Sequence, residues 1–256
     1  MGILNITPDS FYDGGYFTTQ FDQLKQVERM ISEGASIIDI GAISTRPGAN
    51  LPGEKEELER LLICLTAVSS HFPEAVISVD TFRTSVAKAA IDHGATMIND
   101  ICGGRFDGKM YELVASRNIP YILMHMQGMP DDMQINPHYR DLIGEIRDFF
   151  HSCLDLMPAG FSQVILDPGF GFGKTVEDNF RLLQHFDTYI EFGYPLLAGL
   201  SRKSMINRVL QITPSEALNG TSVLNTVVLL KGANILRVHD VREAVEAIKL
   251  VKALEG

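Results

Sequence analysis

Residues 164–175 read Val-Ile-Leu-Asp-Pro-Gly-Phe-Gly-Phe-Gly-Lys-Thr, an apolar run that ends in a carboxylate and opens into a glycine loop. An apolar run this short is typical of a buried strand, and Pro168 ends the strand because proline cannot donate to a ladder. Glycines let the backbone approach a ligand closely, and Thr175 followed by Asp178 predicts a helix start. Asp167 is therefore expected at the carboxyl end of a buried strand.

The glycine loop does not match either common nucleotide motif. A Walker A loop has four residues between its first glycine and Gly-Lys, whereas Gly169 and Gly173 enclose three. The dinucleotide pattern Gly-x-Gly-x-x-Gly also differs from the spacing of Gly169, Gly171 and Gly173. Taken alone, the segment could still be a strand-to-helix turn without chemistry.

The same unit, a helix with a glycine near its end followed by an apolar strand, recurs along the chain. We expect strands at 2–6, 37–40, 76–79, 96–99, 121–124, 164–166, 195–200 and 234–238. Helices are expected near 22–33, 54–72, 84–93, 109–117, 140–157, 176–187, 215–231 and 241–254. A capping box at Thr213–Glu216 predicts the start of the helix at 215, and Asp240 is expected to cap the last helix.

Eight strand–helix units without a change in composition predict an α/β fold, a single (β/α)8 TIM barrel domain over residues 1–256. The alternative is a doubly wound open sheet. Two long loops, 7–20 after the first strand and 42–53 after the second, are rich in Gly, Pro, Ser and Thr. Loops of this length in a compact domain are commonly functional, and we expect both to be mobile. The first strand begins almost at residue 1, so we also expect residues upstream.

Composition limits the classes of partner. A net charge of −10 argues against nucleic acid and anionic membranes, because both require a basic surface. The three cysteines, Cys64, Cys102 and Cys153, are far apart and odd in number, which suggests neither a disulfide framework nor a zinc site. No signal-type or membrane-spanning apolar segment is visible, so a cytoplasmic location is expected.

Polar residues follow the predicted strands, and in such a barrel the active site forms at these carboxyl ends. The polar strand-end residues are Asn5, Asp39, Asp80, Asn99, Asp100, His125, Asp167, Lys203, Arg237, His239 and Asp240. Several have simple structural alternatives: Asp240 as a helix cap, Asp100 as a loop-bracing acid, and Asp39 as a buried partner for a loop. His125 is expected to be a hydrogen-bonded rim histidine rather than a ligand. The convergence of the others on one mouth favours a functional site.

These side chains divide into two chemistries. Asp80, Asn99 and Asp167 suit the edge of a planar heterocycle that carries amine and lactam N–H groups. Arg237, His239 and Asn5 lie on the adjacent last and first strands and could hold an anion, with Arg46 reaching in from the second loop. Phe172 adds an aromatic wall. Together, the polar residues at the strand ends predict a ligand that joins a heterocycle to a phosphate-type leaving group.

Seven segments in order resemble the dihydropteroate synthase family of the folate pathway; they are residues 1–11, 44–49, 78–81, 98–101, 167–174, 201–204 and 237–240. The resemblance implies a (β/α)8 barrel, generally a homodimer, that uses Mg2+. It also implies condensation of 6-hydroxymethyl-7,8-dihydropterin pyrophosphate with para-aminobenzoate, which yields 7,8-dihydropteroate and pyrophosphate, and a sulfonamide target.

The resemblance also implies roles for individual residues. Catalysis would rest on Asp80, Asp167, Lys203 and Arg237. The pterin would be bound by Asp80, Asn99, Asp167 and Lys203, the pyrophosphate by Asn5, Arg237 and His239 with Asn5 beside the metal, and the aminobenzoate by Thr45, Arg46, Pro47, Phe172 and Ser204. Ile43 departs from the family, which often has an acidic residue there.

Two other functions remain as alternatives. One is a pterin-binding methyltransferase module, which would not require the Ser-Thr-Arg-Pro-Gly and Ser-Arg-Lys-Ser segments. The other is a non-catalytic pterin-binding protein, which would not require the anion-binding residues.

Overall fold

The fold is a parallel barrel, seen in a computed structural model that describes residues 1–6, 19–43 and 52–255. Its strands are β1 (Gly2–Asn5), β2 (Ile37–Gly41), β3 (Val76–Asp80), β4 (Met97–Asp100), β5 (Tyr121–Met124), β6 (Val164–Asp167), β7 (Leu197–Ala198) and β8 (Ile235–Leu236). Each strand lies at an apolar run where the sequence predicted a strand, although β7 and β8 are shorter than predicted. The two long loops fall largely on residues 7–18 and 44–51, outside the described residues.

The barrel is closed. Strands β1 to β6 form one sheet in sequence order, and β7 pairs with β8. Parallel bridges between Leu166 and Leu196 and between Gly2 and Val238 join these two sheets at both seams. At the second seam the Ile3 amide donates to the Val238 carbonyl at 3.0 Å. The open doubly wound alternative is therefore wrong.

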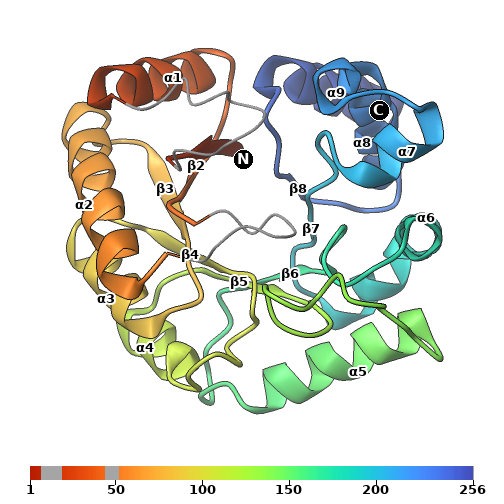
Figure 1. Ribbon diagram of the computed structural model, residues 1–256, viewed down its shortest axis with the longest axis horizontal. Helices are drawn as coiled ribbons and strands as arrows, with labels where there is room; N and C mark the ends of the chain where they lie inside the picture. Colours follow the sequence, from red (N-terminus) through yellow and green to blue (C-terminus); the bar gives the residue numbers. More distant parts are fainter. Residues whose placement is uncertain (7–18, 44–51, 256) are drawn as a thin grey trace.

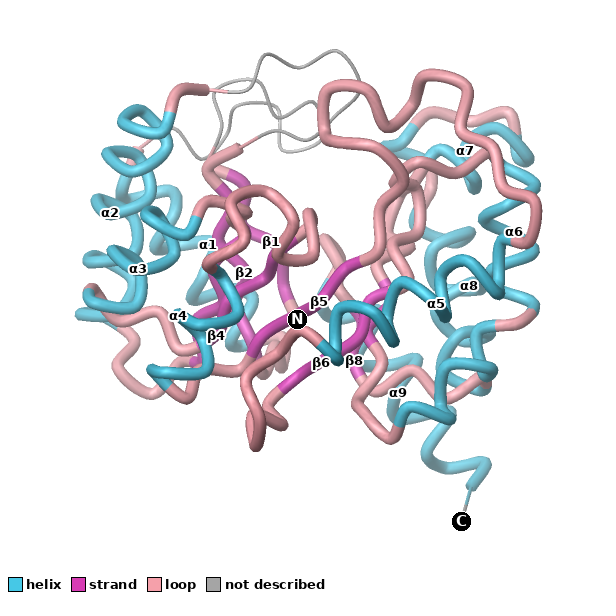
Figure 2. Tube along the Cα trace, turned by 90° about the horizontal axis from the view of Figure 1, so that it is seen from below, coloured by secondary structure: helices cyan, strands magenta, loops and turns pink. Residues whose placement is uncertain are grey.

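Helices surround the strands as a ring (Figure 1). They are α1 (Gln20–Ser32), α2 (Glu54–His71), α3 (Thr84–Asp92), α4 (Met110–Arg117), α5 (Leu142–Asp155), α6 (Val176–Gln184), α7 (Ser204–Leu210), α8 (Leu218–Leu230) and α9 (Val241–Glu255), with 3-10 helices η1 (Phe186–Phe192) and η2 (Pro214–Glu216). Viewed from the side, the helices flank the strands on both sides (Figure 2). Among the described residues no helix is both long and apolar enough to cross a membrane.

Two helix predictions need correction. Helix α7 was not predicted, because seven residues directly after a polar turn carry too little periodicity to reveal a helix. The capping box is present, with Glu216 accepting from the Thr213 amide at 2.9 Å, but it starts η2 rather than the long helix. Helix α8 begins only at Leu218. The box at Thr175 and Asp178 starts α6 as predicted.

Buried apolar residues lie on both sides of the barrel wall, because side chains of a strand alternate between its two faces. The largest cluster lies between strands and helices and includes Cys64, which is 1% exposed. Inside the barrel, Met97, Ile122, Ile165 and Leu197 form a separate apolar cluster. Two residues beyond Met97, Ile122 and Ile165, on the same face of their strands, lie Asn99, Met124 and Asp167, respectively. The apolar cluster therefore forms a floor beneath the polar strand ends.

Candidate functional site

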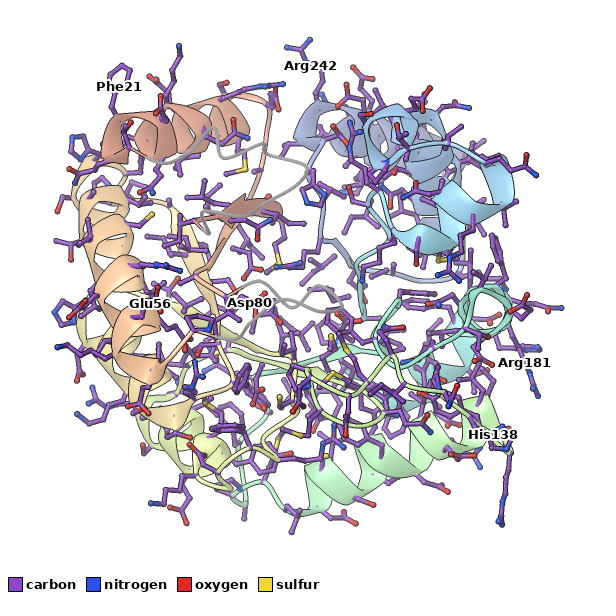
Figure 3. The ribbon with its side chains drawn as sticks, in the orientation of Figure 1. Phe21, Glu56, Asp80, His138, Arg181 and Arg242 are labelled. Atoms are coloured by element: carbon purple, nitrogen blue, oxygen red, sulfur yellow. The ribbon has the colours of Figure 1, made fainter. Side chains whose placement is uncertain are left out.

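The polar strand ends meet at one mouth of the barrel. Asp80 lies near the centre of the ring, whereas Glu56, His138 and Arg181 lie at its periphery (Figure 3). The described members of the predicted site are Asn5, Asp80, Asn99, Asp167, Phe172, Lys203, Ser204, Arg237 and His239. Thr45, Arg46 and Pro47 lie outside the described residues.

Arg237 is the centre of a charged cluster. Its Nε donates to Asp39 Oδ2 at 2.7 Å, and its Nη2 donates to Asp80 Oδ2 at 2.9 Å. Asn99 Nδ2 donates to the same Asp39 oxygen at 3.1 Å. Burial opposes the charge of Arg237, but attraction to Asp39 and Asp80 raises its pKa above the usual value. The guanidinium is thus permanently cationic and held in a fixed plane.

Asp80 is a carboxyl group whose pKa is shifted upward by its surroundings. Burial raises its pKa to about 7, the charge of Arg237 opposes this rise, and the charge of Asp39 adds to it.

A backbone hydrogen bond to one carboxylate oxygen of Asp167 fixes the orientation of the whole carboxylate. Its Oδ1 accepts from the Gly169 amide at 2.8 Å, a contact possible because Gly169 adopts φ 74°. A Cβ at Gly169 would lie 1.9 Å from the His125 carbonyl oxygen, so no other residue fits there. Burial raises the pKa of Asp167, and the Lys203 charge opposes that rise. Asp100, by contrast, accepts from the Cys102 and Gly104 amides and the Tyr121 hydroxyl, which confirms it as a loop-bracing acid.

Lys203 and Phe172 form one wall of the mouth. Lys203 Nζ lies 4.8 Å from the centroid of the Phe172 ring and donates to the Phe170 carbonyl. Burial lowers the pKa of Lys203 to about 8, which the charge of Asp167 partly opposes. The wall therefore combines an aromatic face with an amine that can donate to a ligand. Ser204 follows as the exposed first residue of α7.

A second lysine, Lys174, is buried beneath the glycine loop. Its Nζ contacts the Gly169 carbonyl at 2.9 Å, the Phe172 carbonyl at 3.1 Å and His125 Nδ1 at 3.1 Å. Burial holds the pKa of His125 well below its usual value, so the imidazole is neutral and can accept. This confirms His125 as a hydrogen-bonded rim histidine. Lys174 thereby ties the loop that follows Asp167 to the end of β5.

Burial also lowers the pKa of Lys174 from 10.5 to about 7, which makes stability depend on pH. Between these values the unfolded chain binds more protons at Lys174 than the folded chain, so stability should rise with pH. Since one pKa unit corresponds to about 1.4 kcal/mol, the rise should amount to a few kcal/mol. The free energy of unfolding, measured with urea at about pH 7 and about pH 9.5, should rise much less between these two pH values in Lys174→Met than in the wild type. Lys88→Met, at an exposed position of α3, is the control. An unchanged slope in Lys174→Met would contradict the burial effect.

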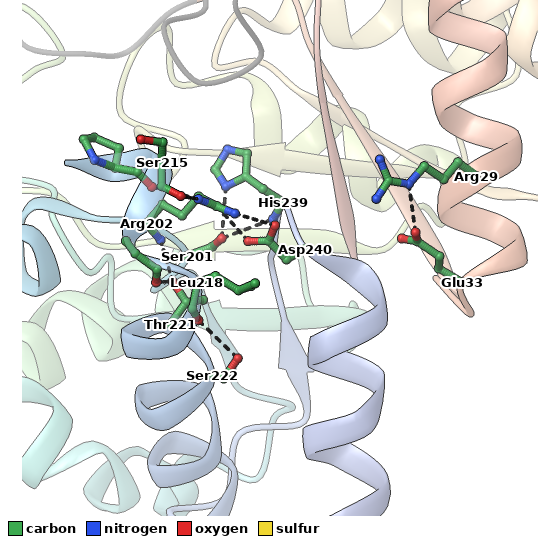
Figure 4. A network of polar contacts seen from close by, with 12 residues as sticks. Arg29, Glu33, Ser201, Arg202, Ser215, Leu218, Thr221, Ser222, His239 and Asp240 are labelled. Carbon is green, nitrogen blue, oxygen red and sulfur yellow. Dashed lines mark hydrogen bonds and ion pairs between the residues drawn. The ribbon is translucent and has the colours of Figure 1, made fainter. Parts of the chain in front are cut away.

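His239 lies in a network that joins the end of β8 to the turn before α7 (Figure 4). Ser201 Oγ and His239 Nδ1 are 3.0 Å apart. Arg202, at φ 56°, donates from Nε and Nη2 to the two oxygens of Asp240, both at 2.7 Å. Asp240 begins α9 through its backbone carbonyl, while its carboxylate holds Arg202. The prediction that Asp240 only caps a helix therefore missed the ion pair between its carboxylate and Arg202.

The side-chain oxygens of Asn5 and Asp80 lie on either side of Gly41 at the mouth of the barrel. No group of three or more His, Cys, Asp or Glu in the described part of the chain could hold a metal. A Cβ at Gly41 would lie 3.7 Å from both Asn5 Oδ1 and Asp80 Oδ2, so these two oxygens flank the same glycine. Mg2+ commonly keeps several waters and takes only one or two protein oxygens plus substrate phosphates.

Three residues of the site were not predicted as such: Asp39, Lys174 and Arg202. Asp39 stood out only as an acid inside an apolar strand, and its partners lie 60 and 198 residues away in the chain. Lys174 closes the glycine motif, and Arg202 precedes Lys203, so local sequence marked both positions without revealing their contacts.

Comparison with known proteins identifies close relatives over nearly the whole chain. Residues 1–239 match the family described as pterin binding enzyme. The dihydropteroate synthase of Escherichia coli (strain K12) is 44% identical over 256 residues, covering 99% of this chain and 90% of the relative. The Yersinia pestis dihydropteroate synthase in a sulfonamide drug complex superposes with a TM-score of 0.93 at 42% identity, covering 100% of this chain and 93% of that one. The Xanthomonas albilineans enzyme with 4-aminobenzoic acid gives a TM-score of 0.90 at 38% identity, with the same coverages.

Proposed function

The chain belongs to the dihydropteroate synthase family of pterin-binding enzymes, and we propose how its strand-end residues carry that family's reaction. It is a transferase of folate biosynthesis that condenses 6-hydroxymethyl-7,8-dihydropterin pyrophosphate with para-aminobenzoate, giving 7,8-dihydropteroate and pyrophosphate. One observation carries the assignment of roles. A cationic Arg237 and the acceptors Asp167 and Asn99 line the same mouth, so one site can hold an anion and a heterocycle.

The pterin half is assigned to Asp80, Asn99, Asp167 and Lys203. With Oδ1 of Asp167 held by Gly169, its Oδ2 can accept from the pterin amine. Lys203 can donate to a ring acceptor from beside Phe172. Asp80 and Asp167 then place carboxylates where positive charge spreads into the ring as the pyrophosphate departs. This arrangement requires no protein nucleophile.

The pyrophosphate half is assigned to Arg237, His239 and Asn5. Among the described residues, Arg237 donates to carboxylates from Nε and Nη2, and its other N–H groups can donate to phosphate oxygens. Asn5 would hold Mg2+ through its side-chain oxygen, and the bound ion would neutralise charge on the leaving group. Arg237 and His239 would stabilise that charge as the bond breaks.

The aminobenzoate is assigned to Thr45, Arg46, Pro47, Phe172 and Ser204. Of these, Phe172 and Ser204 are described; Lys203 directly precedes Ser204, and its Nζ lies 4.8 Å from the centroid of the Phe172 ring. The Phe172 ring offers an aromatic face for the benzoate ring.

Release of pyrophosphate on mixing the two substrates tests this function. Release should require both substrates and should fall when EDTA removes Mg2+. A methyltransferase module or a non-catalytic pterin-binding protein would bind the pterin but release no pyrophosphate, and that result would refute the proposal.

We propose that the protein is a homodimer through α7 and α8. Val209, Leu210, Val223 and Leu230 are each at least half exposed on these helices. Leu210 packs beside Gly220, and Val223 and Leu230 lie two turns apart on one face of α8. Sedimentation should show a dimer that Val223→Glu converts toward monomer. A wild-type monomer at micromolar concentration would contradict it.

We also propose that residues 1–256 form one pterin-binding domain, since a parallel bridge joins Val238, just after β8, to Gly2 of β1, and α9 runs to Glu255. A single cooperative unfolding transition is expected. The reducing cytoplasm stays a prediction, consistent with three free, buried cysteines.

A further inference from the structure

A fully buried carboxylate lies beneath the mouth of the barrel. Asp39, in the middle of β2, is 0% exposed. Its Oδ2 accepts from Arg237 Nε at 2.7 Å and from Asn99 Nδ2 at 3.1 Å. These donors come from β8 and β4, on opposite sides of the strand that carries Asp39. One oxygen therefore connects the residue assigned to the pyrophosphate with a residue assigned to the pterin.

The contact to Nε fixes the orientation of the Arg237 guanidinium. The group is planar, and it is held at two points, at Nε by Asp39 and at Nη2 by Asp80. A planar fork held at two points cannot turn about its own axis without breaking a hydrogen bond. The N–H groups of Arg237 that bond to no described residue therefore have one direction before any ligand arrives.

We propose that Asp39 is a positioning residue that holds Arg237 and Asn99 in a fixed relation, so that the pyrophosphate and the pterin ring are aligned for cleavage of the bond between them. This inference rests on the proposed function. Asp39 acts through its two partners and not by contact with substrate. Misplacement of a reacting group by about 1 Å can cost on the order of 100-fold in rate, so such alignment matters for turnover.

The competing interpretation is that Asp39 only balances the charge of a partly buried arginine. Asp80 already supplies a carboxylate to Arg237. Asn99 is neutral and needs no counter-charge, yet it donates to the same Asp39 oxygen. Charge balance therefore does not explain the second hydrogen bond, whereas positioning explains both.

Two substitutions of similar size separate the interpretations. Asp39→Leu removes the acceptor and the charge, while Asp39→Asn removes the charge but can keep an amide oxygen at the Oδ2 position. No described residue bonds to Asp39 Oδ1, so the asparagine NH2 group can occupy that side. Positioning predicts that kcat for pyrophosphate release falls on the order of 100-fold in Asp39→Leu and that Asp39→Asn recovers most of it. Charge balance predicts equal losses in both variants, and that result would overturn the proposal.

Ser78→Ala is the matched control for changes inside the barrel. Ser78 is the β3 register partner of Asp39, is fully buried, and its Oγ has no partner among the described residues. Its kcat should stay within about twofold of wild type, because it positions neither Arg237 nor Asn99. A loss in Ser78→Ala equal to that in Asp39→Leu would show a general effect of the barrel interior and refute the assignment.

A second measurement applies even if Asp39→Leu does not fold. Arg237→Lys keeps a cation but has no Nε–H for Asp39 to hold. Its kcat should fall at least about tenfold, while calorimetric affinity for inorganic pyrophosphate with Mg2+ stays within about threefold. Wild-type kcat would overturn the positioning role. Failure of the proposed function would look different, since wild-type protein would then release no pyrophosphate.

Discussion

Asp167→Asn should lose pterin binding and turnover together while the protein remains folded. The Gly169 amide would attract the carbonyl oxygen of the new side chain to the position of Oδ1. The NH2 group would then face the amine edge of the pterin, donor against donor. A buried unmatched pair costs about 1–3 kcal/mol, which corresponds to a roughly 5- to 150-fold loss of affinity.

Calorimetry with a pterin that lacks pyrophosphate measures the first effect, and pyrophosphate release measures the second. Asp100→Asn is the matched control, because Asp100 is also a buried strand-end carboxylate but is engaged by Cys102, Gly104 and Tyr121. It should lower the melting temperature and leave pterin affinity of the folded protein unchanged. Unaltered pterin affinity in Asp167→Asn would exclude the role of Asp167.

Arg237→Ala should lower kcat by about 10²–10³ and weaken pyrophosphate binding far more than binding of the bare pterin. The reason is that the negative charge met by Arg237 is largest after the bond to pyrophosphate has broken. Isothermal titration with pyrophosphate and with the bare pterin separates the two affinities. Arg181→Ala, at the periphery of the ring, is the control (Figure 3). Equal losses for both ligands would indicate disruption of β8 instead.

The same substitution should make stability strongly dependent on pH. It leaves Asp39 and Asp80 without their shared cation, and loss of one partner of a buried ion pair costs about 3–5 kcal/mol. Burial already raises the pKa of Asp80 to about 7, and removal of the opposing Arg237 charge should raise it further. The folded variant then holds a proton that the unfolded chain releases, so its stability should increase as pH falls from about 8 to about 5.5. Urea unfolding at the two pH values measures this. A stability loss that is the same at both would contradict the coupling.

The architecture and the chemistry of the strand ends could be predicted from local sequence. Short apolar runs separated by amphipathic helices predict parallel strands covered by helices, and polar residues directly after those runs must lie at one mouth once the barrel closes. Asp80, Asn99, Asp167, Lys203, Arg237 and His239 were identified in this way. Helix α7 could not be, because seven residues after a polar turn carry too weak a periodic signal.

Which side chains bind one another was decided only by the tertiary structure. Nothing near Asp39 in the chain distinguishes a loop partner from the residue that holds Arg237, 198 positions away. The contact exists because closure of the barrel brings β2 and β8 to either side of β1, and because the strand register places Asp39 beneath Asp80. Lys174 is likewise buried under the glycine loop only because β5 brings His125 against it. Sequence determined which functional groups this protein has at its strand ends, while long-range packing determined their orientation, their partners and their pKa values, because these depend on neighbours that are distant in the chain.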